Sequence, residues 1–161
     1  MSTQRCKSYI SHLKISHSIV LQQLDGLSNE DMLRQPQPRG NCANWVLGHI
    51  IASRHSMTRL FDKPFVWDQA TIKLYNYGSD PITSAESPHI PLEALLEAYE
   101  TSKVSLLECL EQATDADLEK VINDQGTTAN DRISFMIWHE SYHSGQFEYL
   151  RQLADKNDKV V

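Results

Sequence analysis

The sequence contains few cysteines, and their placement does not suit a protein held together by disulfides. Cys6, Cys42 and Cys109 are odd in number and far apart, and no two of them form a C-x-x-C pair. Small secreted domains that depend on disulfides carry dense and paired cysteines instead. We therefore expect reduced thiols and a cytoplasmic location.

Long apolar runs are also missing. The longest covers only residues 135–138, whereas a membrane-spanning helix needs about 20 consecutive apolar residues. The first thirty residues carry Arg5, Lys7 and Lys14 and no continuous apolar stretch. These features predict a chain with neither a signal peptide nor a membrane span, and hence no membrane partner.

Clusters of basic residues are absent as well. Lys and Arg together number 15 against 21 Asp and Glu, which gives a formal net charge of -6. An acidic chain without a basic patch is poorly suited to bind DNA or RNA, so we expect no nucleic-acid partner. With 161 residues, of which 40% are hydrophobic, the chain can bury the core of a single domain spanning residues 1–161.

No stretch shows the alternating pattern of a β-strand, whereas four stretches repeat apolar residues at spacings of three and four. Gly26 is a stop signal for the first of these stretches, Pro91 suits the first position of the third, and Thr128 with Asp131 forms the capping pattern of the fourth. Asn41 or Asn44 is expected to cap the second. The predicted helices cover about residues 2–25, 41–62, 91–113 and 128–155.

These four helices predict an all-α fold, a four-helix bundle around one core. Short loops favour antiparallel neighbours, but residues 63–90 form a connection long enough to traverse the whole bundle. Such a connection leaves the second and third helices parallel. The expected topology is therefore up-down-down-up.

What the sequence does have is histidine, seven residues in all. His139 and His143 belong to an H-E-x-x-H pattern and lie on the apolar stripe of the fourth helix. Residues four apart share one helix face, close enough for both imidazoles to bind one metal ion. The alternative is a pair of buried histidines held by hydrogen bonds alone. Because an unpaired buried imidazole is costly, the stripe favours the metal site.

A third ligand should come from another helix that faces the same core. His49 is the best candidate, because it lies on the inner face of the second helix and follows Gly48, which leaves room for a close neighbour. His17, on the stripe of the first helix, is either a fourth ligand or a hydrogen-bonded core histidine. Trp45, Trp138 and Tyr142 flank these positions and are expected in the core or lining a pocket.

Residues 44–50 (NWVLGHI) and 139–146 (HESYHSGQ), in this order and with a long link between them, resemble the DinB/YfiT-like metal-binding four-helix bundles. The resemblance implies that His49, His139 and His143 hold a divalent metal such as nickel, zinc, iron or manganese, with water in the open positions. It also implies a homodimer. Characterised members of that family include transferases and isomerases that use low-molecular-weight thiols such as bacillithiol, mycothiol or glutathione.

Three neutral imidazoles leave a bound metal its full positive charge. An open site of this kind lowers the pKa of a bound water or thiol and polarises a carbonyl oxygen. We therefore expect a metal-dependent transferase, resembling a thiol S-transferase or isomerase, or a hydrolase that acts on a small-molecule substrate. The alternative is a non-catalytic, metal-stabilised, dimerising bundle in a stress response, in which His17 closes the coordination sphere.

Glu140 is the candidate catalytic residue. In zinc metalloproteases the glutamate of H-E-x-x-H acts as the general base, but here no further histidine follows His143, which disfavours a protease. Glu140 lies about 100° around the helix from His139, so a partly exposed carboxylate, or one that supports the ligands from behind, is the competing interpretation. A DNA-associated role, suggested by the damage-inducible name of the family, conflicts with the acidic charge.

Overall fold

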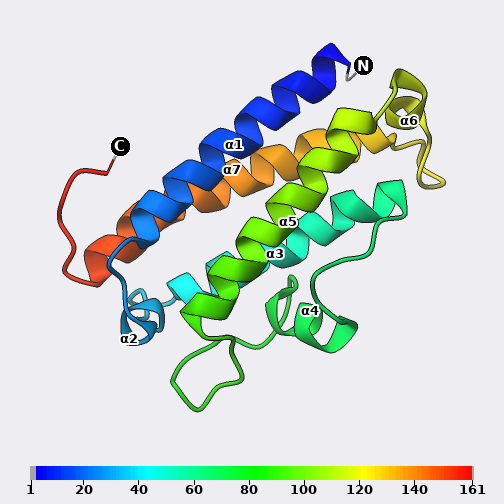
Figure 1. Cartoon of the computed structure of the whole chain (residues 1–161). Coiled ribbons are helices and arrows are strands. Elements are labelled where there is room, and N and C mark those ends of the chain that lie inside the picture. The colour runs from blue at the N-terminus through cyan, green and yellow to red at the C-terminus, as the bar shows by residue number, and fades with distance from the viewer. Residues whose placement is uncertain (1–2, 161) are drawn as a thin grey trace.

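Four long helices make up the body of the structure, a computed structural model that describes residues 3–160 (Figure 1). They are α1 (Gln4–Leu24), α3 (Ala43–Thr58), α5 (Leu92–Gln112) and α7 (Ala129–Leu153). The connections contain three short helices, α2 (Asn29–Met32), α4 (Gln69–Tyr75) and α6 (Asp115–Glu119), and the 3-10 turn η1 (Arg59–Phe61). Within residues 3–160 no strand forms, so the predicted all-α class is confirmed.

The helix ends follow local sequence signals. The Thr3 hydroxyl accepts a hydrogen bond from the Cys6 N–H at 3.2 Å, so α1 begins at Gln4; the predicted start at Ser2 lies outside the described residues. Thr128 and Asp131 form the predicted capping box, in which each side chain accepts a hydrogen bond from the backbone N–H of the other. Pro91 is the residue before the first turn of α5 and not its first helical position.

The second predicted helix is shorter than expected. It starts at Ala43 with Cys42 as its N-cap residue, so the prediction that Asn41 or Asn44 caps this helix is wrong. It ends at Thr58, because the chain tightens into η1 and then turns at Asp62, whose φ of 53° lies in the left-handed region. The end predicted near Asp62 thus included this additional turn.

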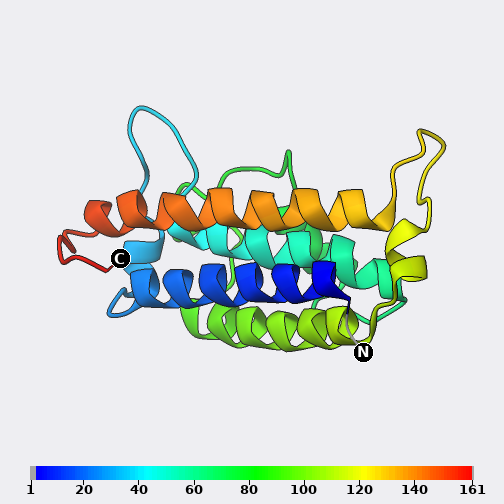
Figure 2. The same ribbon diagram turned by 90° about the horizontal axis from the view of Figure 1, so that it is seen from above.

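Two views of the bundle show its topology. α3 and α5 run in the same direction, whereas α1 and α7 run in the opposite direction (Figures 1 and 2). The helices contact one another around a closed circuit, α1 with α7, α7 with α3, α3 with α5 and α5 with α1. The connection between α3 and α5 returns to the starting end of the bundle and packs η1 and α4 against α3. The up-down-down-up topology is therefore confirmed.

The core consists of two apolar clusters separated by polar residues. One cluster lies around Leu47, Tyr75 and Phe147, and the other around Leu106 and Ile133. Several buried polar side chains separate the two clusters. Four of them, one from each long helix, meet at the Arg54 guanidinium, and we call these four residues the buried polar layer: His17, Arg54, Ser102 and Glu140. Among residues 3–160, no helix is both long and apolar enough to cross a membrane.

Candidate metal centre

The seam between α3 and α7 brings the three predicted ligands together. The Nε2 atom of His139 lies 3.3 Å from Nε2 of His49 and 3.1 Å from Nε2 of His143, and ligand atoms of all three residues lie within 4.8 Å of one another. A metal bound at about 2.0–2.1 Å holds neighbouring nitrogens roughly 3 Å apart. The three histidines could therefore hold a metal ion. His49 and His143 are buried and His139 is half-buried.

The Nδ1 atoms of two candidate ligands, His49 and His143, are held by hydrogen-bond acceptors. Nδ1 of His49 donates a hydrogen bond to the Tyr75 carbonyl oxygen at 2.6 Å, and Nδ1 of His143 donates to Oε1 of Gln146 at 2.7 Å. These bonds place the ring proton on Nδ1 and leave the Nε2 lone pair free to bind a metal, the arrangement common in metal sites. Nδ1 of His139 is buried and has no hydrogen-bond partner within residues 3–160.

This donor set fits a divalent metal. Two Nε2 lone pairs point toward Nε2 of His139, whose single proton can satisfy only one of them, whereas a cation satisfies all three nitrogens at once. Burial lowers the pKa of His49 and of His143 below the usual range. Burial, and then the neighbouring histidines, lower the pKa of His139 to about 4. All three rings are therefore neutral at pH 7, as ligation requires.

Gly48 leaves the space in which Tyr75, the residue whose carbonyl oxygen accepts a hydrogen bond from His49, packs against α3. A Cβ atom at Gly48 would lie 2.1 Å from Cδ1 of Tyr75, so the tyrosine ring packs directly on the α3 backbone. The Tyr75 hydroxyl donates to Oδ1 of Asn44 at 3.0 Å and accepts from the Ile90 N–H at 2.8 Å. Sequence reasoning predicted a close neighbour for Gly48 but missed Tyr75, because residues 63–90 show no clear helical period.

Comparison with known proteins identifies the family. The sequence model of the DinB superfamily matches residues 12–147. The chain belongs to the DinB superfamily. No curated protein matches it. A crystal structure of a conserved protein from Enterococcus faecalis is similar, with a TM-score of 0.74 over 95% of this chain and 97% of that chain at 18% identity; this likeness supports the DinB-like helical fold.

Aromatic rings surround the ligands of this DinB protein on two sides. Trp45 is buried, as expected for the core, and stacks on His49 with ring centroids 4.5 Å apart. Trp138 and Tyr142 are instead 59% and 56% exposed, which corrects their expected place in the core or a pocket. Phe135 and Tyr142 lie beside the two ligand rings of α7, with centroid distances of 6.0 Å and 5.1 Å.

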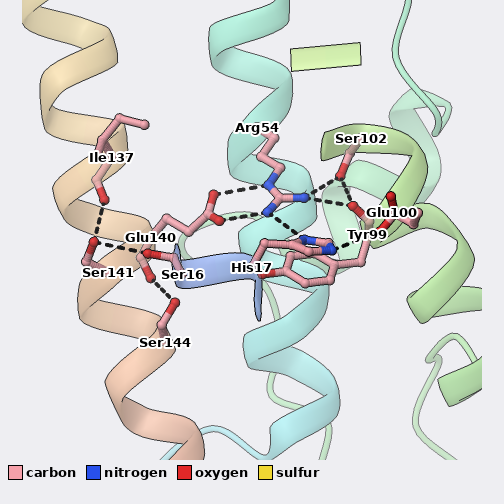
Figure 3. A network of polar contacts seen from close by, with 10 residues as sticks. All are labelled: Ser16, His17, Arg54, Tyr99, Glu100, Ser102, Ile137, Glu140, Ser141 and Ser144. Carbon is pink, nitrogen blue, oxygen red and sulfur yellow. Dashed lines mark hydrogen bonds and ion pairs between the residues drawn. The ribbon is translucent and has the colours of Figure 1, made fainter. Parts of the chain in front are cut away.

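Glu140 occupies an environment unlike that of a general base. Its side chain is only 3% exposed, and both carboxylate oxygens accept hydrogen bonds from the guanidinium of Arg54, at 3.0 Å from Nε and 2.7 Å from Nη2 (Figure 3). A general base needs an oxygen free to reach the proton it removes. The structure therefore does not support the predicted catalytic role, and the expectation of partial exposure is wrong. Sequence reasoning missed Arg54, although a charged residue within the apolar stretch of α3 was a signal.

His17 lies in the buried polar layer and not among the three ligands. Its ring stacks on Tyr99 at 4.2 Å, Nε2 lies 2.9 Å from Oε2 of Glu100, and Nδ1 lies 3.5 Å from Nη2 of Arg54. Burial, with the nearby Arg54 and Lys103 charges, lowers its pKa to about 4 despite Glu100. A neutral ring satisfies both neighbours, because Nε2–H donates to Glu100 while the Nδ1 lone pair faces the guanidinium. His17 is thus a hydrogen-bonded core histidine, one of the two alternatives that the sequence left open, and its ring nitrogens face Glu100 and Arg54.

Proposed function

We propose that this DinB-superfamily protein binds one divalent transition-metal ion per chain through His49, His139 and His143, and uses it in a transferase or hydrolase reaction on a small molecule. The observation that carries the proposal is the convergence of three Nε2 atoms whose rings are neutral. Imidazole ligands suit zinc, nickel and iron, and also bind manganese. Zinc and nickel are the first ions to test.

A metal held by three neutral imidazoles retains its charge and has positions left for water, a thiol or a carbonyl oxygen. The residues of the chain orient the ligands: the Tyr75 carbonyl holds His49, and Gln146 holds His143. Trp45 covers one face of the His49 ring and keeps water from it. The exposed rings of Phe135 and Tyr142 offer an apolar contact to a small substrate beside the site.

The proposed reaction is thiol transfer or isomerisation, with a low-molecular-weight thiol as one substrate, and hydrolysis is the competing chemistry of the same site. A non-catalytic metal-stabilised bundle depended on His17 as a fourth ligand, and His17 faces Arg54 and Glu100 instead. A homodimer remains part of the proposal, supported by the exposed aromatic side chains of α7. A cytoplasmic location is supported by the three free, buried cysteines.

Metal analysis tests the site directly. Purified protein loaded with zinc or nickel and freed of excess ion should hold close to one metal per chain, and His49→Ala, His139→Ala and His143→Ala should each lose most of it. His12→Ala is the matched control, because His12 is an exposed histidine of α1 whose Nδ1 lies 2.9 Å from the Ser8 carbonyl oxygen. Full metal retention by all three ligand variants would refute the site.

Activity requires a second experiment. The metal-loaded protein is incubated with glutathione, bacillithiol or mycothiol and a panel of electrophiles, and separately with small esters and amides. Turnover should disappear after chelation and return when metal is restored, and it should be absent in the His49→Ala variant. If no thiol or ester is converted in a metal-dependent way, the reaction classes are dropped and only the metal site stands.

A further inference from the structure

A fully buried arginine connects all four long helices of the bundle. Arg54 of α3 is 0% exposed and forms the two hydrogen bonds to Glu140 of α7 described above (Figure 3). Its Nη1 donates to the Tyr99 carbonyl at 2.8 Å and to Oγ of Ser102 at 2.9 Å, both on α5, and its Nη2 faces His17 of α1. The guanidinium also lies 4.2 Å from the centroid of the Tyr99 ring.

The two members of this ion pair lie next to the metal ligands in the sequence. Arg54 follows His49 by five residues on α3, which corresponds to about 7.5 Å along the helix axis, and Glu140 follows His139 directly on α7. The helix itself determines the spacing between His139 and His143. The place of His49 relative to them depends on how α3 and α7 are aligned, and the Arg54–Glu140 pair joins these two helices.

A bidentate arginine–carboxylate pair is suited to hold two helices in one alignment. Its two parallel hydrogen bonds have a defined geometry, so sliding or rotating α3 against α7 breaks both. Apolar side chains of similar volume give a comparable or greater free energy of unfolding at a buried site, but without directional bonds. A buried pair with this geometry is therefore suited to fix the alignment of α3 and α7, whatever its contribution to the free energy of unfolding.

We propose that the Arg54–Glu140 pair positions the metal ligands, by holding the alignment of α3 and α7 that brings His49 to His139 and His143. The glutamate of the H-E-x-x-H pattern is thus a positioning residue that acts through the two helices. This inference rests on the proposed function, because it concerns the same metal site.

The test replaces the pair without leaving a lone buried charge. In the double variant Arg54→Met with Glu140→Met, urea unfolding should show a folded protein, because both charges are removed together. Zinc affinity, measured by competition with a chromogenic chelator, should fall about 10- to 100-fold, the range typical of residues that support metal ligands. The absorption spectrum of the cobalt-loaded protein should change, which reports an altered coordination geometry. Glu140→Gln has nearly the same shape as the native residue and serves as a second variant in case the double variant does not fold. Its zinc affinity and its cobalt spectrum are measured in the same way and should change in the same direction.

Arg151→Met is the matched control. Arg151 is also a buried arginine, 6% exposed on α7, but it donates to the Gln23 and Asp25 carbonyls near the end of α1 and does not join the ligand-bearing helices. Its loss should lower the free energy of unfolding while zinc affinity and the cobalt spectrum stay as in the native protein.

A cycle with His49→Ala separates positioning from general stability. If the pair places His49, removing His49 should reduce zinc affinity less in the double variant than in the native protein. A folded pair variant with native zinc affinity and cobalt spectrum would overturn the positioning role and leave the metal site standing. Native protein that binds neither zinc nor cobalt would overturn the proposed function, and this inference with it.

Discussion

Replacing Gly48 by alanine places a methyl group inside the ring of Tyr75. The added Cβ would lie 2.1, 2.3 and 2.5 Å from three ring carbons, whereas carbon atoms in good contact are about 3.5–4.0 Å apart. The ring must therefore move by roughly 1.5 Å. Tyr75 is fully buried, stacks on Trp67 at 5.4 Å and forms two hydrogen bonds through its hydroxyl. These contacts leave it little freedom to adjust.

The expected loss of unfolding free energy in Gly48→Ala is the sum of three contributions. Overpacking of a buried site costs about 1–3 kcal/mol, and each weakened hydrogen bond costs about 0.5–1.5 kcal/mol. The better helix propensity of alanine returns up to about 1 kcal/mol. We therefore expect Gly48→Ala to lower the free energy of unfolding by about 2 kcal/mol, and Tm by roughly 4–8 °C in a chain of this size. Zinc affinity should fall as well, because the displaced Tyr75 carbonyl orients His49.

Urea and thermal unfolding of the metal-free protein, followed by circular dichroism, measure the stability change. Gly145→Ala is the matched control, because Gly145 also lies within a long helix, but no described atom outside its chain neighbours and the adjoining backbone of that helix lies within 4 Å of its added Cβ. That variant should gain up to about 1 kcal/mol from helix propensity alone. If Gly48→Ala is as stable as native protein, or gains stability as the control does, the close packing of Tyr75 on α3 is wrong.

Three further predictions concern the residues behind the ligands. Arg54→Met alone should lower the free energy of unfolding by about 3–5 kcal/mol in urea titrations, because it leaves the Glu140 carboxylate buried and unpaired; a cost as small as that of the double replacement would contradict this. Gln146→Ala should weaken zinc binding about 10-fold in the chelator competition with little change in stability, since it frees Nδ1 of His143, and unchanged affinity would remove Gln146 from the site. Burial lowers the pKa of His17 from an ordinary 6.5 to about 4 in the folded state. The unfolded chain therefore takes up a proton at a higher pH than the folded protein does, so the contribution of His17 to the free energy of unfolding is fully present above pH 6.5 and is lost as pH falls from 6.5 to 4. Between these values the native protein should lose about 3 kcal/mol more stability than His17→Gln, and equal pH profiles would show that His17 is not buried as a neutral ring.

Much of the bundle could be predicted from the sequence because its signals are local. The capping box of Thr128 and Asp131 lies within one turn, and the spacing of His139 and His143 places them on one face of any helix. The length of residues 63–90 was enough to predict that α3 and α5 run parallel, since only a long connection can return to the starting end. The position of Gly48 likewise indicated a close neighbour.

Other features could not be predicted because they depend on residues far apart in the chain. The Tyr75 carbonyl lies in a segment without helical periodicity, and it reaches His49 only because α4 packs on α3. The role of Glu140 depended on a partner 86 residues away. When only the sequence of α7 is considered, Glu140 lies in an H-E-x-x-H pattern, which is the pattern of the general base in a metalloprotease.

The sequence by itself determined the helices, their order and the histidines that can share one metal, because helix formation and i, i+4 spacing are properties of short segments. Only the tertiary structure decided which buried polar groups meet. Packing four helices brought Arg54 between Glu140, His17 and the α5 backbone, and a buried charge must find its partners wherever the fold places them. That packing pairs both carboxylate oxygens of Glu140 with Arg54, and we propose that the pair holds the alignment of the two helices that carry the histidines.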